Sequence, residues 1–242
     1  MADTSSSHAA NDSAPAHGST PNAAASKAWL NLYPEWTPPH IDYNFDTLLD
    51  VYRHTLSNHP RRKALTFFGR STSYAELDAK VRSVAAGLRA LGVRKGDRVA
   101  LLMPNCPQHV IAYWAVLHLG AVAVEHNPLY TAHELRHPFN DHGARFAICW
   151  DKIVPVLEDL RNNTPLETII AVNMLQDLPF VMRTALSIPL PKLRAARAKL
   201  HSSAPQVMGF DALLHDAVGG DVHDLQADES ITADDTAVMM YT

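Results

Sequence analysis

The chain has 242 residues, and 47% of them are hydrophobic, which is enough to bury the core of one domain or of one domain with a tail. Its 21 Lys and Arg residues nearly balance 25 Asp and Glu residues, so the formal net charge of −4 gives no electrostatic reason to expect nucleic acid as a partner. The two cysteines, Cys106 and Cys149, have no metal-type spacing, which favours a reducing, cytoplasmic location.

The first 28 residues are rich in Ala, Ser, Asn, Asp and His. Without a basic start and an apolar core they do not read as a signal peptide, and they are too polar to offset the entropy of ordering. The most apolar stretch, 110–124, is shorter than a membrane span and contains His118, so no transmembrane helix is expected. We therefore predict a disordered tail over 1–28 and a single domain over 29–242, which opens with an extended, aromatic arm at 29–40.

The first predicted elements are a helix at 47–58 and, after Pro60, a short strand at 64–68 that ends in a turn at Gly69. The clearest helix of the chain comes next. Ser73 and Glu76 form a capping box at its start, and Gly92 is suited to cap its end. Apolar residues then recur at steps of four and three along one face of this helix: Leu77, Val81, Val84, Leu88 and Leu91.

Strands and helices alternate with short links through the middle of the chain. We predict strands at 98–103, 121–124, 145–150 and 167–172 and helices at 105–119, 131–143 and 152–162. Asn105 is the predicted cap of the first of these helices, and Thr131 with Glu134 forms a capping box for the second. Such alternation is typical of an α/β fold with a parallel sheet flanked by helices. A last strand is predicted at 237–241.

Residues 173–205 break this alternation with four prolines. No acidic residue lies between Asp177 and Asp211, so the segment is basic. One interpretation is a surface excursion with a short basic helix. The other is that 179–200 contacts a membrane surface or guides an acyl chain, since basic segments are attracted to anionic lipids. The basic residues are Arg183, Lys192, Arg194, Arg197 and Lys199.

Four groups of sequence strings, in this order and spacing, resemble the N-terminal region of the adenylate-forming (AMP-dependent) acyl-CoA synthetases. The third group is similar to the long-chain fatty acid–CoA ligase branch in particular. The resemblance covers about 45–172 and 210–242, and 1–28 match nothing. The strings are Ser73–Leu77 with Gly92–Val99; Met103–Asn105 with Leu119–Val122; Asn127–Thr131 with Glu134–Leu135 and Asn140–Ala144; and Asp234–Ala237 with Tyr241–Thr242.

The resemblance implies a ligase of lipid metabolism with ATP, magnesium, CoA and a fatty acid as cofactors and substrates. ATP and the carboxylate give an acyl-adenylate and pyrophosphate, and the CoA thiol then attacks the adenylate. Adenylation must come before the attack of CoA, because a carboxylate is a poor electrophile until its oxygen belongs to a good leaving group. The phosphate charge must be held by magnesium, a lysine and backbone amides.

The phosphate loop of this family reads Tyr-Thr-Ser-Gly-Thr-Thr-Gly-x-Pro-Lys-Gly, and the resemblance assigns its first two residues to Tyr241 and Thr242. The remainder of the loop, the adenine pocket, the magnesium ligand and the catalytic lysine are expected beyond Thr242. We therefore predict a partial N-terminal domain, truncated before the phosphate loop. It offers Tyr241 and Thr242 for nucleotide binding, contains no catalytic or metal-binding residue, and is inactive by itself.

Two alternatives from other classes stay open. The chain could be a non-catalytic gene fragment or scaffold. It could also be a zinc hydrolase, because His133, Glu134 and His137 fit H-E-x-x-H, in which two histidines bind zinc and the glutamate acts as base. Pro138 argues against zinc, since it would distort that helix, and Glu134 already has a role in the capping box.

Three smaller motifs have both a structural and a functional interpretation. Cys106 begins a helix, where the pKa of a thiol can fall, but a buried small residue is favoured. Asp234 and Asp235 could bind metal, but a turn before a strand is favoured. Asn127 and Pro128 indicate a turn after a strand.

Overall fold

The computed structural model describes residues 25–38, 44–215 and 230–241. The chain divides into two compact units, 1–44 and 45–242. In the first unit a 3₁₀ helix, η1 (Ala25–Leu32), begins within the predicted tail and occupies the start of the predicted arm, so an extended arm is wrong for 29–32. The rest of the predicted tail, 1–24, lies outside the described residues.

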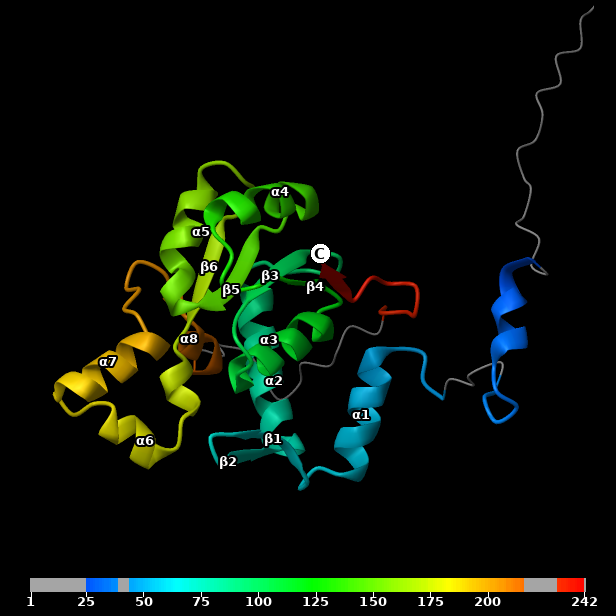
Figure 1. The fold of residues 1–242 in the computed structure, drawn as a ribbon, viewed down its shortest axis with the longest axis horizontal. Coiled ribbons are helices and arrows are strands. Elements are labelled where there is room, and N and C mark those ends of the chain that lie inside the picture. Colours follow the sequence, from blue (N-terminus) through cyan, green and yellow to red (C-terminus); the bar gives the residue numbers. More distant parts are fainter. Residues whose placement is uncertain (1–24, 39–43, 216–229, 242) are drawn as a thin grey trace, which may run out of the picture. The chain divides into compact units, whose positions relative to one another are not determined.

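A parallel sheet forms the centre of the second unit, as predicted from the alternation (Figure 1). Its strand order is β7-β6-β5-β3-β4-β8, and every neighbouring pair is parallel. The short strand β7 was not predicted, because two residues are too few to show a period. The strands are β3 (Arg98–Leu102), β4 (Val122–Glu125), β5 (Phe146–Trp150), β6 (Thr168–Val172), β7 (Met208–Gly209) and β8 (Val238–Met240).

Helices cover both faces of this sheet, which explains why its central strands are apolar on both sides (Figure 1). One face packs on α2 (Tyr74–Ala90), α3 (Pro107–His118) and α8 (Phe210–His215). The other face packs on α4 (Ala132–His142) and α5 (Val154–Arg161), the latter preceded by η2 (Asp151–Ile153). Successive residues of β3 alternate between the two cores: Leu101 lies in the first, Ala100 and Leu102 in the second.

Capping boxes begin three of the helices. Those of α2 (Ser73 with Glu76) and α4 (Thr131 with Glu134) are confirmed, and α1 (Leu48–Asn58) has a further one between Thr47 and Asp50. The predicted cap of α3 is wrong. Cys106, not Asn105, is its N-cap residue, and no side chain bonds the end of the helix. Pro107 sets this start, because it fixes a helical φ and has no N–H to satisfy.

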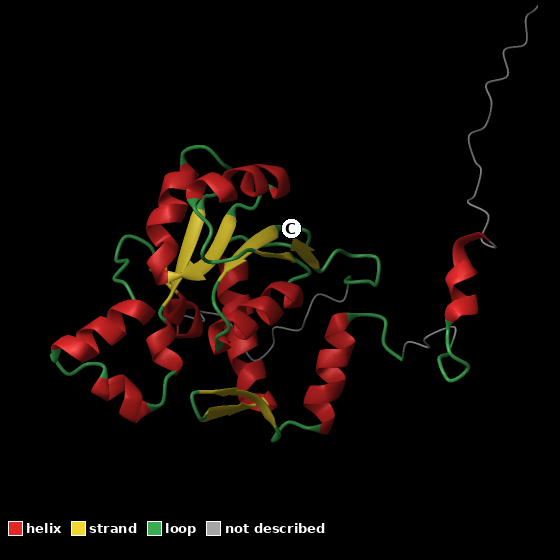
Figure 2. Ribbon diagram, viewed as in Figure 1, coloured by secondary structure: helices red, strands yellow, loops and turns green. Residues whose placement is uncertain are grey.

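A two-stranded antiparallel sheet stands apart from the main sheet (Figure 2). It pairs β1 (Lys63–Phe67) with β2 (Arg70–Ser73). The sequence predicted β1 but not β2. The residues of β2 are polar, and the capping box at Ser73 indicated only the start of the following helix. Phe68 and Gly69 both have positive φ values, 47° and 85°, which suits a tight hairpin turn.

Residues 173–205 contain η3 (Met174–Asp177), α6 (Phe180–Ala185) and α7 (Pro191–Leu200), and neither α6 nor α7 buries a residue. The surface excursion with a basic helix, one of the two interpretations, is confirmed for 179–200, whereas η3 at the start is mostly buried. The far end of the excursion is tied to the end of β5. There the Trp150 indole N–H donates to the Leu200 carbonyl at 2.8 Å, and Asp151 accepts hydrogen bonds from His201 and the Ser202 amide.

Candidate functional site

Open parallel sheets bind ligands beyond the carboxyl ends of their strands. In this sheet three neighbouring strands, β3, β4 and β8, end side by side. Glu125 of β4 is in register with Leu101 of β3 and with Met240 of β8. The residues that follow these strands, and the helix starts next to them, therefore form the candidate site.

Glu125 points to the face of the sheet covered by α3. The Nε2 atom of His109, in the first turn of α3, lies 3.0 and 2.9 Å from the two carboxylate oxygens. Both side chains are half-buried and reachable by solvent. Sequence reasoning missed this pair, because its members are 16 residues apart and meet only through the packing of α3 on β4.

His126, the next residue, points to the opposite face, as strand alternation requires. Its ring stacks on those of Phe139 and Tyr241, with centroid distances of 5.3 and 5.6 Å and interplanar angles of 21° and 15°. Its Nε2 atom lies 3.0 Å from Nε2 of His142. Burial lowers the pKa of both imidazoles to about 4, so both are neutral at physiological pH.

Tyr241 directly follows β8 and is half-buried at the same corner. Its hydroxyl donates to Oδ2 of Asp141, at the end of α4, over 2.6 Å. Burial and this carboxylate raise the pKa of the phenol to about 12. The structure thus places Tyr241 at the carboxyl edge, while Thr242 lies outside the described residues. Nucleotide binding by either residue remains a prediction.

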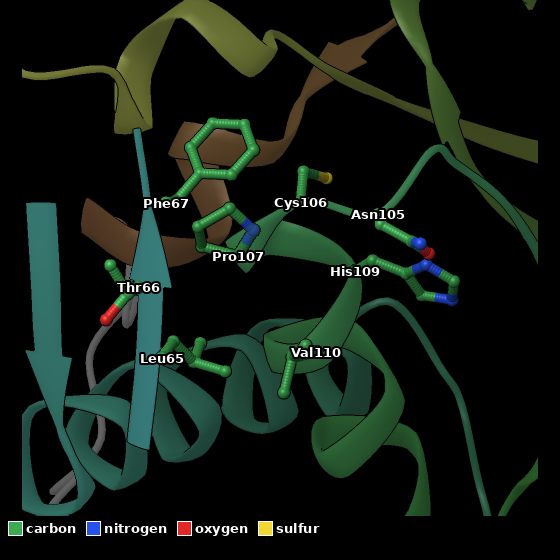
Figure 3. A pocket seen from close by; sticks show the side chains of 8 residues that line it. All are labelled: Leu65, Thr66, Phe67, Asn105, Cys106, Pro107, His109 and Val110. Carbon is green, nitrogen blue, oxygen red and sulfur yellow. The ribbon is translucent and has the colours of Figure 1, made fainter. Parts of the chain in front are cut away.

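A pocket of about 250 Å³ lies between β1 and the start of α3. Figure 3 shows Leu65 and Phe67 on the side of β1 that faces the helix. Burial raises the pKa of the Cys106 thiol to about 11, so the reading as a reactive, acidic thiol is wrong and the buried small residue is confirmed. The pocket is lined by Leu65, Thr66, Phe67, Asn105, Cys106, Pro107, His109 and Val110.

The H-E-x-x-H residues do not form a metal centre in the structure. His133 and His137 are exposed on α4, and the Glu134 carboxylate accepts hydrogen bonds from the Thr131 amide and hydroxyl at 2.7 and 2.8 Å. The capping role of Glu134 is confirmed. Within the described ranges, no three His, Cys, Asp or Glu side chains gather where they could hold a metal ion. Pro138 is accommodated inside α4.

The remaining polar motifs are turns, as favoured from the sequence. Asp235 accepts from the Thr232 amide at 2.7 Å and pairs with Lys95 at 2.8 Å, so its carboxylate holds the approach to β8. Asn127 accepts from the Leu129 amide at 2.9 Å, which shapes the turn after β4.

This fold and this edge define an α/β domain of the class that binds its ligand beyond the carboxyl ends of parallel strands. Residues 52–242 match the family described as AMP-binding enzyme. Since the match covers most of the chain, the chain belongs to this family. The fold is that of the N-terminal domain of the adenylate-forming ligases, as the sequence indicated.

Several curated relatives carry the name long-chain-fatty-acid–CoA ligase. The protein of Escherichia coli O6:H1 is 31% identical over 191 residues, which are 78% of this chain and 34% of that protein. The protein of Bacillus subtilis is 32% identical over 154 residues, which are 64% of this chain and 28% of that protein. The chain thus spans about a third of the length of the curated relatives it matches.

Solved structures share the fold. The anthranilate CoA ligase AuaEII in complex with anthranoyl-AMP superimposes with a TM-score of 0.64 at 20% identity, over 84% of this chain and 33% of that one. A long-chain-fatty-acid-CoA ligase from Archaeoglobus fulgidus gives a TM-score of 0.62 at 18% identity, over 84% of this chain and 35% of that one. At these identities the likeness concerns the fold alone.

No helix among the described residues is long and apolar enough to cross a bilayer.

Proposed function

We propose that the complete protein containing this chain is a long-chain fatty acid–CoA ligase, which converts ATP, a fatty acid and CoA to acyl-CoA, AMP and pyrophosphate. The observation that carries the proposal is the 31% identity over 191 residues to a relative of that name. Magnesium is the expected companion of the triphosphate, because its charge must be neutralised during transfer. The coarser activity, acid–thiol ligation, is supported by the names of the relatives; the long-chain substrate is the finer part of the proposal.

The position of Tyr241 supports the predicted nucleotide site. A phosphate-binding loop lies between a parallel strand and a helix, so that converging backbone amides can hold the anion. Tyr241 follows strand β8 at the carboxyl edge, where such a loop starts. Tyr241 and Thr242 are therefore proposed as the first residues of the loop. The amides and the lysine that hold the phosphates belong to residues that follow them in the complete protein.

The test is acyl-CoA formation by the complete protein with palmitate and with 4-coumarate as competing acids. Long-chain ligation predicts a clear preference in kcat/KM for palmitate. The alternative acid is chosen because a stretch of 95 residues is 38% identical to 4-coumarate–CoA ligase 4 of Arabidopsis thaliana. Preference for 4-coumarate would reject the fatty-acid proposal but keep the ligase. Absence of any acid-dependent AMP release would favour the non-catalytic scaffold.

Peripheral membrane contact through 179–200 is a second proposed function. Apolar side chains are exposed on and after α6, among them Phe180 at 70% and Val181 at 75%. Ile188 and Leu190 are also exposed before the basic helix α7. An apolar set next to uncompensated positive charge suits the surface of an anionic bilayer, where the rings enter the interface and the cations meet the headgroups.

Vesicle sedimentation tests this contact. Binding to vesicles containing phosphatidylglycerol is expected to exceed binding to pure phosphatidylcholine and to fall with salt. Replacing Arg194, Arg197 and Lys199 by Gln should weaken it. A matched control removes the same number of exposed charges elsewhere, at Arg61, Arg62 and Arg136. Equal partition onto both vesicle types, or equal loss in both variants, would contradict a specific contact.

A further inference from the structure

A pair of buried histidines occupies the corner where β4, β8 and the end of α4 meet. His126 is 7% exposed and His142 is 3% exposed, and their Nε2 atoms lie 3.0 Å apart. Neither residue belongs to the H-E-x-x-H motif or to the proposed loop. Among the described residues, the aromatic rings that contact the pair are those of Phe139 and Tyr241.

The hydrogen bonds allow only one arrangement of protons in this pair. Nδ1 of His142 accepts the Ala144 backbone N–H at 3.0 Å, so this nitrogen carries no proton. The proton of neutral His142 must then sit on Nε2, where it is donated to Nε2 of His126. His126 in turn carries its own proton on Nδ1, a buried atom that has no partner among the described residues.

An added proton would break this arrangement wherever it bound. On Nε2 of His126 it would face the Nε2–H of His142, and on Nδ1 of His142 it would face the Ala144 N–H. Both outcomes set two donors against each other in a buried space, which costs the hydrogen bond and leaves a charge desolvated. The geometry therefore requires that both imidazoles stay neutral.

Charged groups on β3, β4 and α4 act on the pair. Glu125 of β4 favours protonation of His126, and Asp141 of α4 favours protonation of His142. Arg98 of β3 opposes protonation of His142, and so does His126 itself. On β8's side the neighbour is the phenol of Tyr241, which is itself bonded to Asp141. Burial outweighs the two carboxylates.

The pair also fixes the residue after β8. The His126 ring stacks on Tyr241 at 15° between planes, and His142 holds His126 in the plane that makes this stack possible. The Tyr241 hydroxyl is bonded to Asp141, only one residue before His142. The ring of Tyr241 is thus held by one histidine of the pair, and its hydroxyl by the residue next to the other histidine.

We propose that His126 and His142 are positioning residues: as a neutral hydrogen-bonded pair they hold Tyr241, and protonation of the pair releases it. If the proposed function is right, release of Tyr241 displaces the start of the phosphate loop and weakens ATP binding. The link to ATP rests on the proposed function, whereas the hold on Tyr241 does not. The first experiment therefore measures the position of the Tyr241 ring, and the second measures KM for ATP.

The first measurement is NMR of the complete protein with tyrosine labelled at the ring carbons, in which Tyr241→Phe assigns the Tyr241 signal. Between pH 7 and pH 4 the signal should move away from its stacked position. His126→Phe keeps a flat ring in the stack but removes the pair, so the signal should lose this pH dependence. His137→Gln, an exposed histidine on the same helix, should titrate like the unmodified protein.

A second variant separates the pair from the local turn. The side chain of Asn can accept the Ala144 N–H as Nδ1 of His142 does, but it is too short to reach His126. His142→Asn should therefore keep the end of α4 and shift the Tyr241 signal already at pH 7. In the active complete enzyme the same variant should raise KM for ATP roughly fivefold, the size expected for one buried hydrogen bond, with kcat little changed.

The outcomes are distinguishable. A Tyr241 signal that ignores pH, or one that titrates equally in His126→Phe, overturns the positioning role. A signal that behaves as expected, in an enzyme whose KM for ATP does not respond to His142→Asn, overturns the link to the nucleotide. Failure of the unmodified protein to use ATP at all rejects the proposed function and leaves the NMR result standing.

Discussion

At the scale of single residues, three buried histidines have pKa values that burial lowers far below the ordinary value. His118, His126 and His142 are each less than a tenth exposed, and burial lowers the pKa of each to about 4. In the unfolded chain their pKa returns to about 6.5. Below that pH these histidines bind protons in the unfolded state but stay neutral in the folded state. The stability that these residues contribute is therefore complete above about pH 6.5 and is lost as the pH falls toward 4.

This predicts that the second unit loses stability between pH 7 and pH 5. The expected loss in the free energy of unfolding is about 2 kcal/mol for each buried histidine, less for the coupled pair. Urea unfolding at the two pH values measures it. His118→Gln should reduce the loss, and His133→Gln, on the surface, should not. Most carboxylates contribute little in this window, because they titrate below it in the unfolded chain. Asp151, whose pKa burial raises in the folded state, acts in the opposite direction. A stability that is flat from pH 7 to 5 would contradict the neutral histidines.

At the scale of elements, Gly87 shows how a contact between helices reverses a local preference. In the middle of a helix, Gly is normally worse than Ala by roughly 0.5–1 kcal/mol. Gly87, however, faces α8, and a Cβ placed on it would lie 2.7 Å from Cδ2 of Leu213 and 3.2 Å from its Cβ. Real side chains do not approach so closely, so the end of the Leu213 side chain would have to move aside and its Cβ would have to give way slightly.

We expect Gly87→Ala to destabilise the chain by about 1–3 kcal/mol, the usual range for overpacking. Leu213→Ala removes Cδ2, the atom of closest approach, and leaves only the Cβ contact at 3.2 Å, so in that background Gly87→Ala should cost clearly less stability. Urea denaturation of both single variants and the double variant gives the coupling energy. Additive effects would show that α2 and α8 are not in contact at this position.

Strand β8 lies at one end of the six-stranded order and has a strand neighbour on one side only among the described residues. Its side chains Val238, Met239 and Met240 are apolar, and Met240 is 75% exposed. An apolar strand with an unpaired edge pairs readily with other chains.

The 242-residue chain in isolation is therefore expected to aggregate. Met240→Lys should lower static light scattering at constant concentration, because an edge charge opposes strand pairing. Leu129→Lys adds the same charge at an exposed loop position and should have little effect. A monomeric chain with a sharp cooperative thermal transition and strong near-UV dichroism would contradict the prediction.

At the scale of the whole molecule, the length of the chain matters most. It spans about a third of the relatives it matches, and Tyr241 is the last residue that the structure describes. ATP binding requires converging amides and a lysine around the phosphates. The first two residues of the proposed loop do not supply them.

We therefore expect no fatty-acid-dependent exchange of pyrophosphate into ATP by residues 1–242 alone, and no ATP binding by calorimetry in the millimolar range. The complete protein should do both. In the complete protein Thr242→Ala should depress adenylation without unfolding the domain, and changing His133 and His137 to Gln should leave the rate nearly unchanged. Activity of the isolated chain would overturn the assignment of the missing groups, and loss of activity on changing the two histidines would restore the metal hypothesis.

Local signals in the sequence were sufficient for the class of fold, the family and the helix starts at Ser73 and Thr131. They succeed because capping boxes and hydrophobic periods act between residues three or four apart. They failed for Asn105, where Pro107 moved the start of α3, and for β2, whose polar residues become a strand only by pairing with β1.

The partners in the candidate site were decided by tertiary structure alone. His126 meets His142 across 16 residues, and Tyr241 meets Asp141 across 100. Each contact depends on which strand lies next to β4 and which helix covers that face. No pattern within a segment encodes this, because strand order and helix placement arise from burying both faces of the sheet at once. The sequence by itself determined the family and the longer helices and strands; packing decided the short strands β2 and β7 and which side chains meet at the ends of the elements.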